Sequence, residues 1–239
     1  MDKTEILKSA ENLIAAEPQA VIAWGLNRFS ALRMNLATSF GAEDQVLADM
    51  VVRIDKKIGI FTLDTGRLPQ ETYDVMELTR SRYGISIEAL FPEKDAVEAL
   101  LAAHGPNQFY RSVELRKSCC HVRKVLSLKK KLSTLSVWIC GLRREQAVTR
   151  GQVSKVEWDE ANGLFKLNPL ADWTEKQVWD YIKANDLPYN RLHDQGYPSI
   201  GCAPCTRAVK PGEDVRAGRW WWENPEHKEC GLHTRDKGK

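Results

Sequence analysis

Hydrophobic and polar positions follow one another along the chain in a repeating order. Short apolar runs at residues 32–40 and 58–63 have the length of buried strands, and both end in small or polar residues. The stretches that follow them, residues 43–53 and 68–84, place apolar side chains three and four positions apart, which is the spacing of a helix. This order predicts a parallel sheet that is covered by helices and joined by right-handed crossovers.

Further elements extend the pattern toward the carboxyl end. An Asn162-Gly163 pair divides residues 153–170 into two apolar runs and predicts a β-hairpin. Thr174 has the position of an N-cap for a short helix at 174–186. After this helix, turn residues dominate and we expect no regular element. The other expected elements are strands at 85–91 and 135–142 and helices at 4–16, 19–29, 95–105 and 113–132.

The composition is that of an ordinary soluble protein. The 239 residues are 43% hydrophobic and 28% charged, which suits one large domain with an appendage. The charged amino-terminal helix does not have the form of a signal peptide, and no run approaches the ~18 apolar residues of a membrane span. We therefore expect a cytoplasmic protein that does not bind a membrane. The net charge of +3 is spread along the chain, so we expect no nucleic-acid partner.

The segment TSFGAED, residues 38–44, joins an expected strand to an expected helix. Backbone N–H groups at such a turn can hold an anion, and Gly41 would allow close approach to it. The segment lacks the lysine of a GxxxxGK[ST] loop, so it should not bind ATP phosphates in that manner. An ordinary strand-to-helix connection remains the alternative. By the same reasoning, LDTGR at residues 63–67 is a second place where a nucleotide could bind.

Cysteines give the strongest chemical signal in the sequence. Four of the six form two close pairs, Cys119-Cys120 and Cys202-Ala-Pro-Cys205, and in a reducing compartment such pairs favour metal binding or redox chemistry. Zinc sites use spaced pairs on turns, whereas adjacent cysteines in a helix suit an iron–sulfur cluster, whose separate irons accept neighbouring thiolates. The spacing favours the cluster and leaves zinc as the alternative. Cys140, within an apolar run, is expected to be a core residue.

Basic residues accompany both cysteine pairs. Residues four apart share a helix face, so Arg123 should lie over Cys119. Lys124 should lie over Cys120 for the same reason. Guanidinium groups bind phosphate and sulfate oxygens in bidentate fashion, although each arginine taken singly could also be a solvated surface residue. The arginines expected to bind an anion are Arg143, Arg144, Arg216 and Arg219.

Six motifs in order, SFGAED, LDTGR, KSCCHVRK, GLRREQ, GYPSIGCAPCTR and KECGLH, resemble the assimilatory adenylyl-sulfate (APS) reductases. These are relatives of the 3'-phosphoadenylyl-sulfate (PAPS) reductases, within the adenine nucleotide alpha-hydrolase-like group. The resemblance implies an α/β fold with a parallel sheet flanked by helices and an irregular, mobile C-terminal tail. It implies a nucleotide-binding reductase domain at residues 1–209 and a flexible segment at 210–239. It also implies one [4Fe-4S] cluster per chain, held by the four paired cysteines, and a catalytic cysteine, Cys230.

The same resemblance implies a mechanism. The Cys230 thiolate would attack the sulfur of adenylyl sulfate, so that AMP leaves and an S-sulfocysteine remains. A separate electron donor, thioredoxin or glutaredoxin, would then release sulfite. The residues that the resemblance assigns to the substrate are Leu63, Asp64 and Gly66 for the adenosine, and Thr38, Ser39, Gly41, Lys124 and the four arginines for the phosphosulfate.

Other functions remain open at this point. The presence of both cysteine pairs favours adenylyl sulfate, with the 3'-phosphorylated substrate, or use of both, as the alternative. A zinc-stabilised binding module would explain the paired cysteines but would leave Cys230 without a role. A cluster-dependent tRNA-thiolating enzyme should carry an SGGxDS-like loop, which this sequence does not contain. The sequence leaves the oligomeric state open, with a homo-oligomer among the alternatives.

Overall fold

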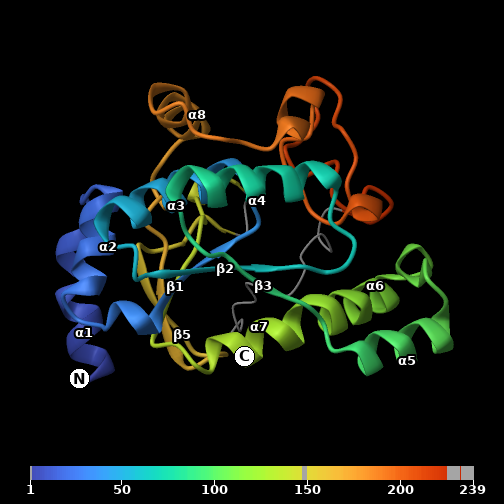
Figure 1. Cartoon of the computed structure of the whole chain (residues 1–239), viewed down its shortest axis with the longest axis horizontal. Helices are drawn as coiled ribbons and strands as arrows, with labels where there is room; N and C mark the ends of the chain where they lie inside the picture. The colour runs from blue at the N-terminus through green and yellow to red at the C-terminus, as the bar shows by residue number, and fades with distance from the viewer. Residues whose placement is uncertain (1, 147–149, 225–231, 233–239) are drawn as a thin grey trace. The chain divides into compact units, whose positions relative to one another are not determined.

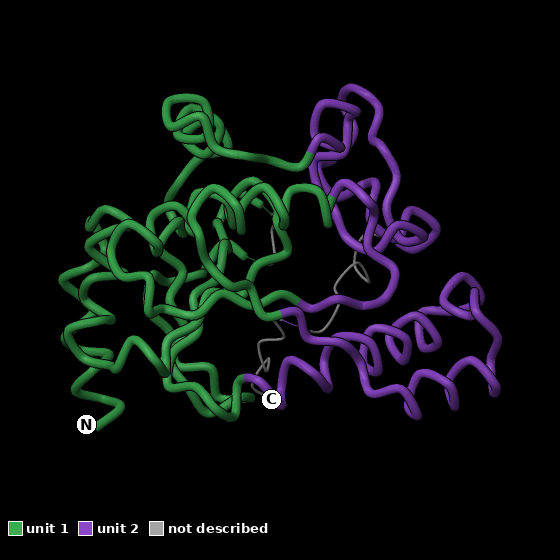
Figure 2. The backbone as a smooth tube through the Cα atoms, viewed as in Figure 1, with its two compact units in different colours: residues 1–62, 72–88, 132–190 green, residues 63–71, 89–131, 191–239 purple. Residues whose placement is uncertain are grey.

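A computed structural model describes residues 2–146, 150–224 and 232. The chain forms two compact units, which Figure 2 shows in different colours. The first unit comprises residues 1–62, 72–88 and 132–190, and the second comprises residues 63–71, 89–131 and 191–239. Cys230 and the last part of the predicted mobile tail, residues 225–231 and 233–239, lie outside the described residues. The predicted boundary at residue 209 therefore stays a prediction.

A six-stranded sheet provides the framework, with the strand order β3-β2-β1-β4-β6-β5 (Figure 1). β1 pairs in parallel with β2 and with β4, and β4 pairs in parallel with β6. β5 runs antiparallel to β6, because the Asn162-Gly163 turn joins them, with Gly163 in the left-handed region at φ 68°. The α/β class is confirmed, and the sheet is mixed at this edge. The strands are β1 Met34–Thr38, β2 Gly59–Leu63, β3 Glu88–Leu90, β4 Val137–Ile139, β5 Val156–Asp159 and β6 Leu164–Leu167.

Helices occupy the predicted places, with two differences. The expected helix at 4–16 ends at Ser9, and a short 3₁₀ turn follows at Glu11–Leu13. The expected helix at 113–132 is divided by a π-helical turn at His121–Val125. Among the described helices, none is long and apolar enough to cross a membrane. The helices are α1 Lys3–Ser9, α2 Pro18–Leu26, α3 Ala42–Ile54, α4 Gln70–Tyr83, α5 Lys94–His104, α6 Val113–Cys120, α7 Leu126–Leu132 and α8 Glu175–Ala184.

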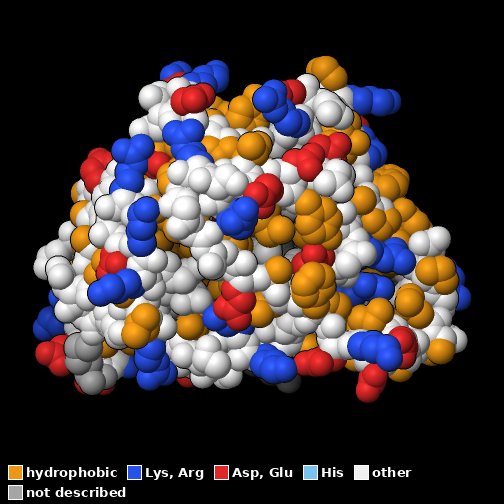
Figure 3. Space-filling model, viewed as in Figure 1, with side chains coloured by type: hydrophobic (Ala, Val, Ile, Leu, Met, Phe, Trp, Pro, Cys, Tyr) orange, Lys and Arg blue, Asp and Glu red, His pale blue; other side chains and the backbone are white. Residues whose placement is uncertain are grey.

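The core of the first unit lies between the central strands and their helices. Leu36 of β1 is level with Ile60 on one side and Ile139 on the other, and all three side chains are buried. Strands β4 and β6 are buried along their whole length, as expected for parallel strands covered on both faces. α3 packs against β1, α2 and α8. Outside this core, basic and acidic side chains are interspersed over the face that Figure 3 shows.

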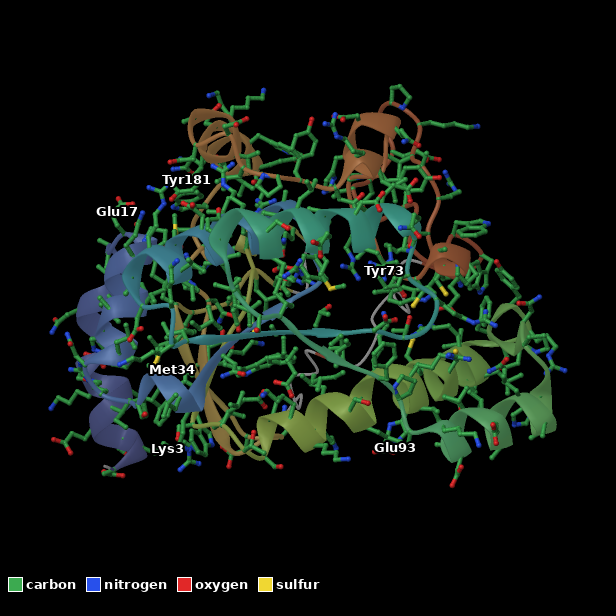
Figure 4. All side chains as sticks on the ribbon, in the orientation of Figure 1. Lys3, Glu17, Met34, Tyr73, Glu93 and Tyr181 are labelled. Atoms are coloured by element: carbon green, nitrogen blue, oxygen red, sulfur yellow. The ribbon has the colours of Figure 1, made fainter. Side chains whose placement is uncertain are left out.

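Asp49 of α3 is a fully buried carboxylate that ties three helices of the first unit together. It accepts hydrogen bonds from the hydroxyl of Tyr83 in α4, at 2.9 Å, and from that of Tyr181 in α8, which Figure 4 labels, at 2.8 Å. Arg53, one turn further along α3, forms an ion pair with it at 2.8 Å. Burial, reinforced by the Asp49 carboxylate, raises the pKa of Tyr181 to about 12. Both phenols therefore remain hydrogen-bond donors at neutral pH.

We expect Asp49→Ala to lower the free energy of unfolding by about 3–5 kcal/mol, because it leaves two partly buried phenols and a guanidinium without their acceptor. Urea denaturation measures the change. Asp180→Ala in α8 is the matched control, since Asp180 pairs with Lys176 on the exposed face of its helix and should contribute little. Equal losses in the two variants would contradict the assignment.

Candidate functional site

One candidate site lies in the first unit, where the strand order of the sheet reverses. β1 has β2 on one side and β4 on the other, so chain connections leave in opposite directions from this point. In open α/β sheets, ligands bind outside the carboxyl ends of the strands at such a position. The segments that leave β1 and β4 here are the predicted TSFGAED and GLRREQ motifs. The sheet therefore brings these two motifs of the first unit to one edge.

The turn after β1 is held by its own side chains. The Asp44 carboxylate accepts hydrogen bonds from the Ser39 amide, at 2.6 Å, and from the Ser39 hydroxyl, at 2.8 Å. The Phe40 amide donates to the Thr38 hydroxyl at 2.9 Å. Two amides predicted to hold an anion thus have acceptors within the turn. The anion-binding roles of Thr38, Ser39 and Gly41 stay predictions.

Phe40 adopts a left-handed backbone conformation, at φ 59°, while its side chain is buried. A bulky residue seldom takes this conformation, and such strain is typically found at functional positions. Gly141, just after β4, lies where a side chain would not fit, because a Cβ there would lie 2.6 Å from Oδ1 of Asp44. Sequence patterns gave no signal for Phe40, whose backbone angle is set by the packing around it. Together Phe40 and Gly141 fix the close approach of the two motifs.

Asp44 is buried beneath this turn, and its carboxyl has an unusual pKa. Burial raises the pKa from its ordinary value of 3.8 to about 6, despite the opposing hydrogen bonds from Ser39. The neighbouring Glu43 carboxylate adds to the increase. A change of protonation at this carboxyl would act directly on the conformation of the Ser39 turn.

Arg143 and Arg144, which we predicted to bind an anion, are paired with carboxylates in this structure. Nε of Arg143 donates to Glu43 at 2.8 Å, and its Nη1 donates to Glu145 at 2.9 Å. Arg144 forms an ion pair with Asp172. An anionic ligand would have to compete with these partners. Because Glu43 lies 100 positions before Arg143, the sequence pattern gave no sign of this pair.

Another candidate site lies within the second unit, where both cysteine pairs line one pocket. Cys119 and Cys120 end helix α6, and Cys202 and Cys205 flank and end a 3₁₀ turn at Ala203–Cys205. All four thiols are buried. Figure 4 shows sulfur atoms gathered beside α6. The other side chains that line the pocket are Arg67, Phe109, Arg116, Arg123, Lys124 and Pro204.

The LDTGR motif holds the second cysteine pair in place. The backbone carbonyl of Arg67 accepts a hydrogen bond from the Ala203 amide at 2.8 Å, and the Thr65 hydroxyl lies 3.2 Å from the Cys202 sulfur. Arg123 donates to the Thr65 carbonyl at 2.7 Å. This predicted nucleotide loop therefore supports the cysteine pocket as well, through Thr65 and Arg67, which the sequence analysis did not single out.

The remaining predicted substrate residues of the second unit lie around this loop and the second cysteine pair. The Asp64 carboxylate accepts from the Gly66 amide at 2.8 Å, and Gly66 has a left-handed φ of 68°. Leu63 ends β2. The Arg219 guanidinium stacks on Trp220 at 4.7 Å from the ring centroid, and the Arg216 amide donates to Asp214. The proposed substrate roles of these residues stay predictions, as does that of Cys230, which lies outside the described residues.

The cations around the pocket change the pKa values of the cysteine thiols to different extents. Burial raises the pKa of Cys205 to about 12, with neighbouring cysteines adding to the increase. Burial also acts to raise the pKa of Cys202, but Lys124, Thr65 and nearby guanidinium groups together bring it below its ordinary value. Burial raises the pKa of Cys119, and the charge of the nearby Arg123 opposes this increase. The charge of Lys124 acts to lower the pKa values of Cys202 and Cys205, and its expected place over Cys120 stays a prediction.

The iron–sulfur cluster predicted on the four paired cysteines stays a prediction, although their buried thiols line one pocket. Within the part of the chain that the structure describes, no three His, Cys, Asp or Glu side chains are grouped closely enough to hold one metal ion. A cluster takes each thiolate on a different iron and therefore needs a wider spacing. Among the residues that the structure describes, Nε of Arg123, which lines the pocket, finds no hydrogen-bond acceptor. An anionic, sulfur-rich group in this pocket would satisfy it.

Comparison with known proteins places this architecture among similar chains. Residues 33–208 match the family described as phosphoadenosine phosphosulfate reductase domain. The adenosine 5'-phosphosulfate reductase of Allochromatium vinosum is 57% identical over 200 residues, which cover 84% of this chain and 78% of that protein. The enzyme of that name from Burkholderia cepacia is 55% identical over 201 residues, covering 84% of this chain and 80% of that protein.

Solved structures show the same relationship at the level of the fold. A phosphoadenylyl-sulfate reductase from Candida auris, in a phosphate complex, has a TM-score of 0.74 at 25% identity and covers 87% of this chain and 98% of its own. An FMN adenylyltransferase from Candida glabrata has a TM-score of 0.55 at 15% identity, covering 94% of this chain and 76% of its own. The second likeness concerns the fold alone.

We expect Asp44→Asn to remove a pH dependence of stability. Because folding raises the pKa of Asp44, the folded state binds its proton more tightly, and this contribution is lost as the pH rises from about 4 to about 6. Relative to the wild type, the variant should gain about 3 kcal/mol across this range, from a shift of about two pKa units. Urea denaturation at pH 4, 5, 6 and 7 tests this, and a constant difference between the two proteins would contradict it.

Proposed function

Because the chain belongs to the phosphoadenosine phosphosulfate reductase domain family, we propose that it reduces adenylyl sulfate to sulfite and AMP, with thioredoxin as electron donor. It is an oxidoreductase that acts on a sulfur group. The observation that carries the choice of substrate is the 57% identity to an adenosine 5'-phosphosulfate reductase over 84% of this chain. The phosphoadenylyl-sulfate reductase structure is more distant, at 25% identity. Reduction of the 3'-phosphorylated substrate, or of both, is the second candidate.

The reaction is a two-electron transfer that thiols can perform. The Cys230 thiolate attacks the sulfur of adenylyl sulfate, the bond between sulfur and the phosphate oxygen breaks, and AMP takes the electron pair. One thiol of reduced thioredoxin then attacks the sulfur of S-sulfocysteine, so that sulfite leaves and a mixed disulfide forms. The second thioredoxin thiol resolves this disulfide and regenerates Cys230. Glutaredoxin could serve as donor by the same chemistry.

The cysteine pocket is proposed to hold one [4Fe-4S] cluster per chain, on Cys119, Cys120, Cys202 and Cys205. When bound, the cluster would supply a fixed structural and electrostatic centre, and the thiol chemistry needs no electron from it. Arg123 and Lys124 balance the charge of the thiolates. The Thr65 hydroxyl orients Cys202 and so connects the LDTGR loop to the pocket. We place these events in the cytoplasm, where thiols remain reduced.

Cys202→Ala should remove the iron and the visible absorption of anaerobically purified protein, because a tetrathiolate site loses one of its four ligands. Cys140→Ala is the matched control, since Cys140 is a buried thiol in the first unit, just after β4. It should keep the iron content of the wild type. Colourless wild-type protein with one zinc per chain would favour the binding-module alternative.

Sulfite release tests the reaction itself. Anaerobic wild-type protein with reduced thioredoxin should form sulfite from adenylyl sulfate, and Cys230→Ser should reduce the rate by at least about 10³-fold, because a hydroxyl cannot replace the thiolate. The 3'-phosphorylated substrate is assayed in parallel. Sulfite from that compound alone would select the second candidate, and sulfite from neither, with iron present, would disprove the reductase function.

A further inference from the structure

The second unit contains a buried ion pair between its cysteine-bearing helix and the segment that precedes Cys230. Arg116 of α6 donates from Nε to Oε1 of Glu223 at 2.9 Å and from Nη2 to Oε2 at 2.7 Å. The Arg116 side chain is fully buried, and that of Glu223 is 2% exposed. Burying two charges is costly and stabilises a fold little compared with apolar packing. The geometry of this pair therefore indicates a positioning role.

Arg116 contacts the cysteine pocket as well as Glu223. It lines the pocket together with Cys120, which follows it by one turn in α6. One guanidinium thus pairs with a carboxylate on one segment and shares a pocket with a proposed cluster ligand on another. Arginine suits this arrangement because its planar group carries donors on more than one edge.

Trp220 also contacts Arg116, and its backbone conformation is strained. The guanidinium of Arg116 lies 4.6 Å from its ring centroid, and the backbone has a left-handed φ of 41°. The Trp220 amide donates to the Cys205 carbonyl at 3.1 Å, and its own carbonyl accepts from the Glu223 amide at 2.8 Å. A buried tryptophan keeps such a conformation only when its surroundings impose it. The segment from Trp220 to Glu223 is thus tied to both cysteine pairs.

We propose that Arg116, Trp220 and Glu223 form a clasp that couples the cysteine pocket to the chain segment leading to Cys230. Arg116 and Glu223 are positioning residues in this assignment, since they act through the pocket and through the tail. The inference rests on the proposed function for the role of Cys230. The clasp itself stands on contacts within the second unit.

The length of chain between Glu223 and Cys230 limits where the Cys230 thiol can act. Cys230 lies seven positions after Glu223, and a fully extended chain spans at most about 3.3–3.6 Å per residue. The Cys230 thiol therefore acts within about 25 Å of the clasp. Releasing Glu223 would remove this limit and lower the effective concentration of the thiol at its target, which reduces the rate of attack more than the binding of substrate.

Glu223→Gln tests the clasp in the intact, cluster-loaded protein. The change removes the charge but keeps the size of the side chain. Hydrogen–deuterium exchange of the resting protein should become at least about tenfold faster both at residues 220–223 and in α6, because both ends of the contact are released. The kcat for sulfite formation, normalised to iron, should fall by about 10–100-fold, while KM for adenylyl sulfate changes little.

Glu213→Gln is the matched control, because Glu213 pairs with Arg207 in the same segment but on an exposed surface. It should leave kcat and the exchange of α6 unchanged. Glu223→Asp retains the charge and should keep much of the rate that Glu223→Gln loses. If Glu223→Gln does not fold, Glu223→Asp is measured in its place. Faster exchange at 220–223 alone, an unchanged kcat, or an equal loss in Glu213→Gln would overturn the coupling. Exchange needs no turnover, so wild-type protein that forms no sulfite would disprove the proposed function and leave the clasp intact.

Discussion

The arrangement of the second unit depends on the free-energy cost of burying charged groups away from water. Four thiols are buried together, and burial alone favours their neutral form, as the pKa of about 12 at Cys205 indicates. Cys202 departs from this behaviour because Lys124, Thr65 and guanidinium groups surround it. The lysine-rich helix, the LDTGR loop and the segment after Cys205 each contribute part of this environment. Their arrangement follows from the need to place several cations around one buried group of sulfur atoms.

The same cost acts at the sheet edge of the first unit, where the charges are already paired. Arg143 is held by Glu43 and Glu145, and the Ser39 turn is held by Asp44. An anionic substrate at this edge would gain little from donors that keep their present partners. Binding there would proceed by exchange, with the ligand oxygens replacing carboxylate oxygens. A raised pKa at Asp44 assists such an exchange, because a protonated carboxyl is a weaker acceptor for the Ser39 amide.

Local signals in the sequence predicted the local structure well. The Asn162-Gly163 turn, the Thr174 cap and the alternation of strands and helices each depend on neighbouring residues, and all three are confirmed. The cysteine spacing likewise predicted that the two pairs would meet. Contacts between distant residues could not be read in this way: Arg116 and Glu223 are 107 positions apart, and nothing in either local sequence identifies the other. The left-handed conformations of Phe40 and Trp220 also arise from tertiary packing and not from residue type.

The sheet by itself does not determine the reaction. An FMN adenylyltransferase aligns with most of this chain at a TM-score of 0.55, although its name describes a different chemistry. In the present chain, two cysteine pairs, Arg67 of the LDTGR loop and the buried Arg116 line one pocket of the second unit. Arg116 is the residue on which these features converge, because it lines the pocket and contacts both Trp220 and Glu223. The pocket and the segment from Trp220 to Glu223 are therefore linked through a single guanidinium group.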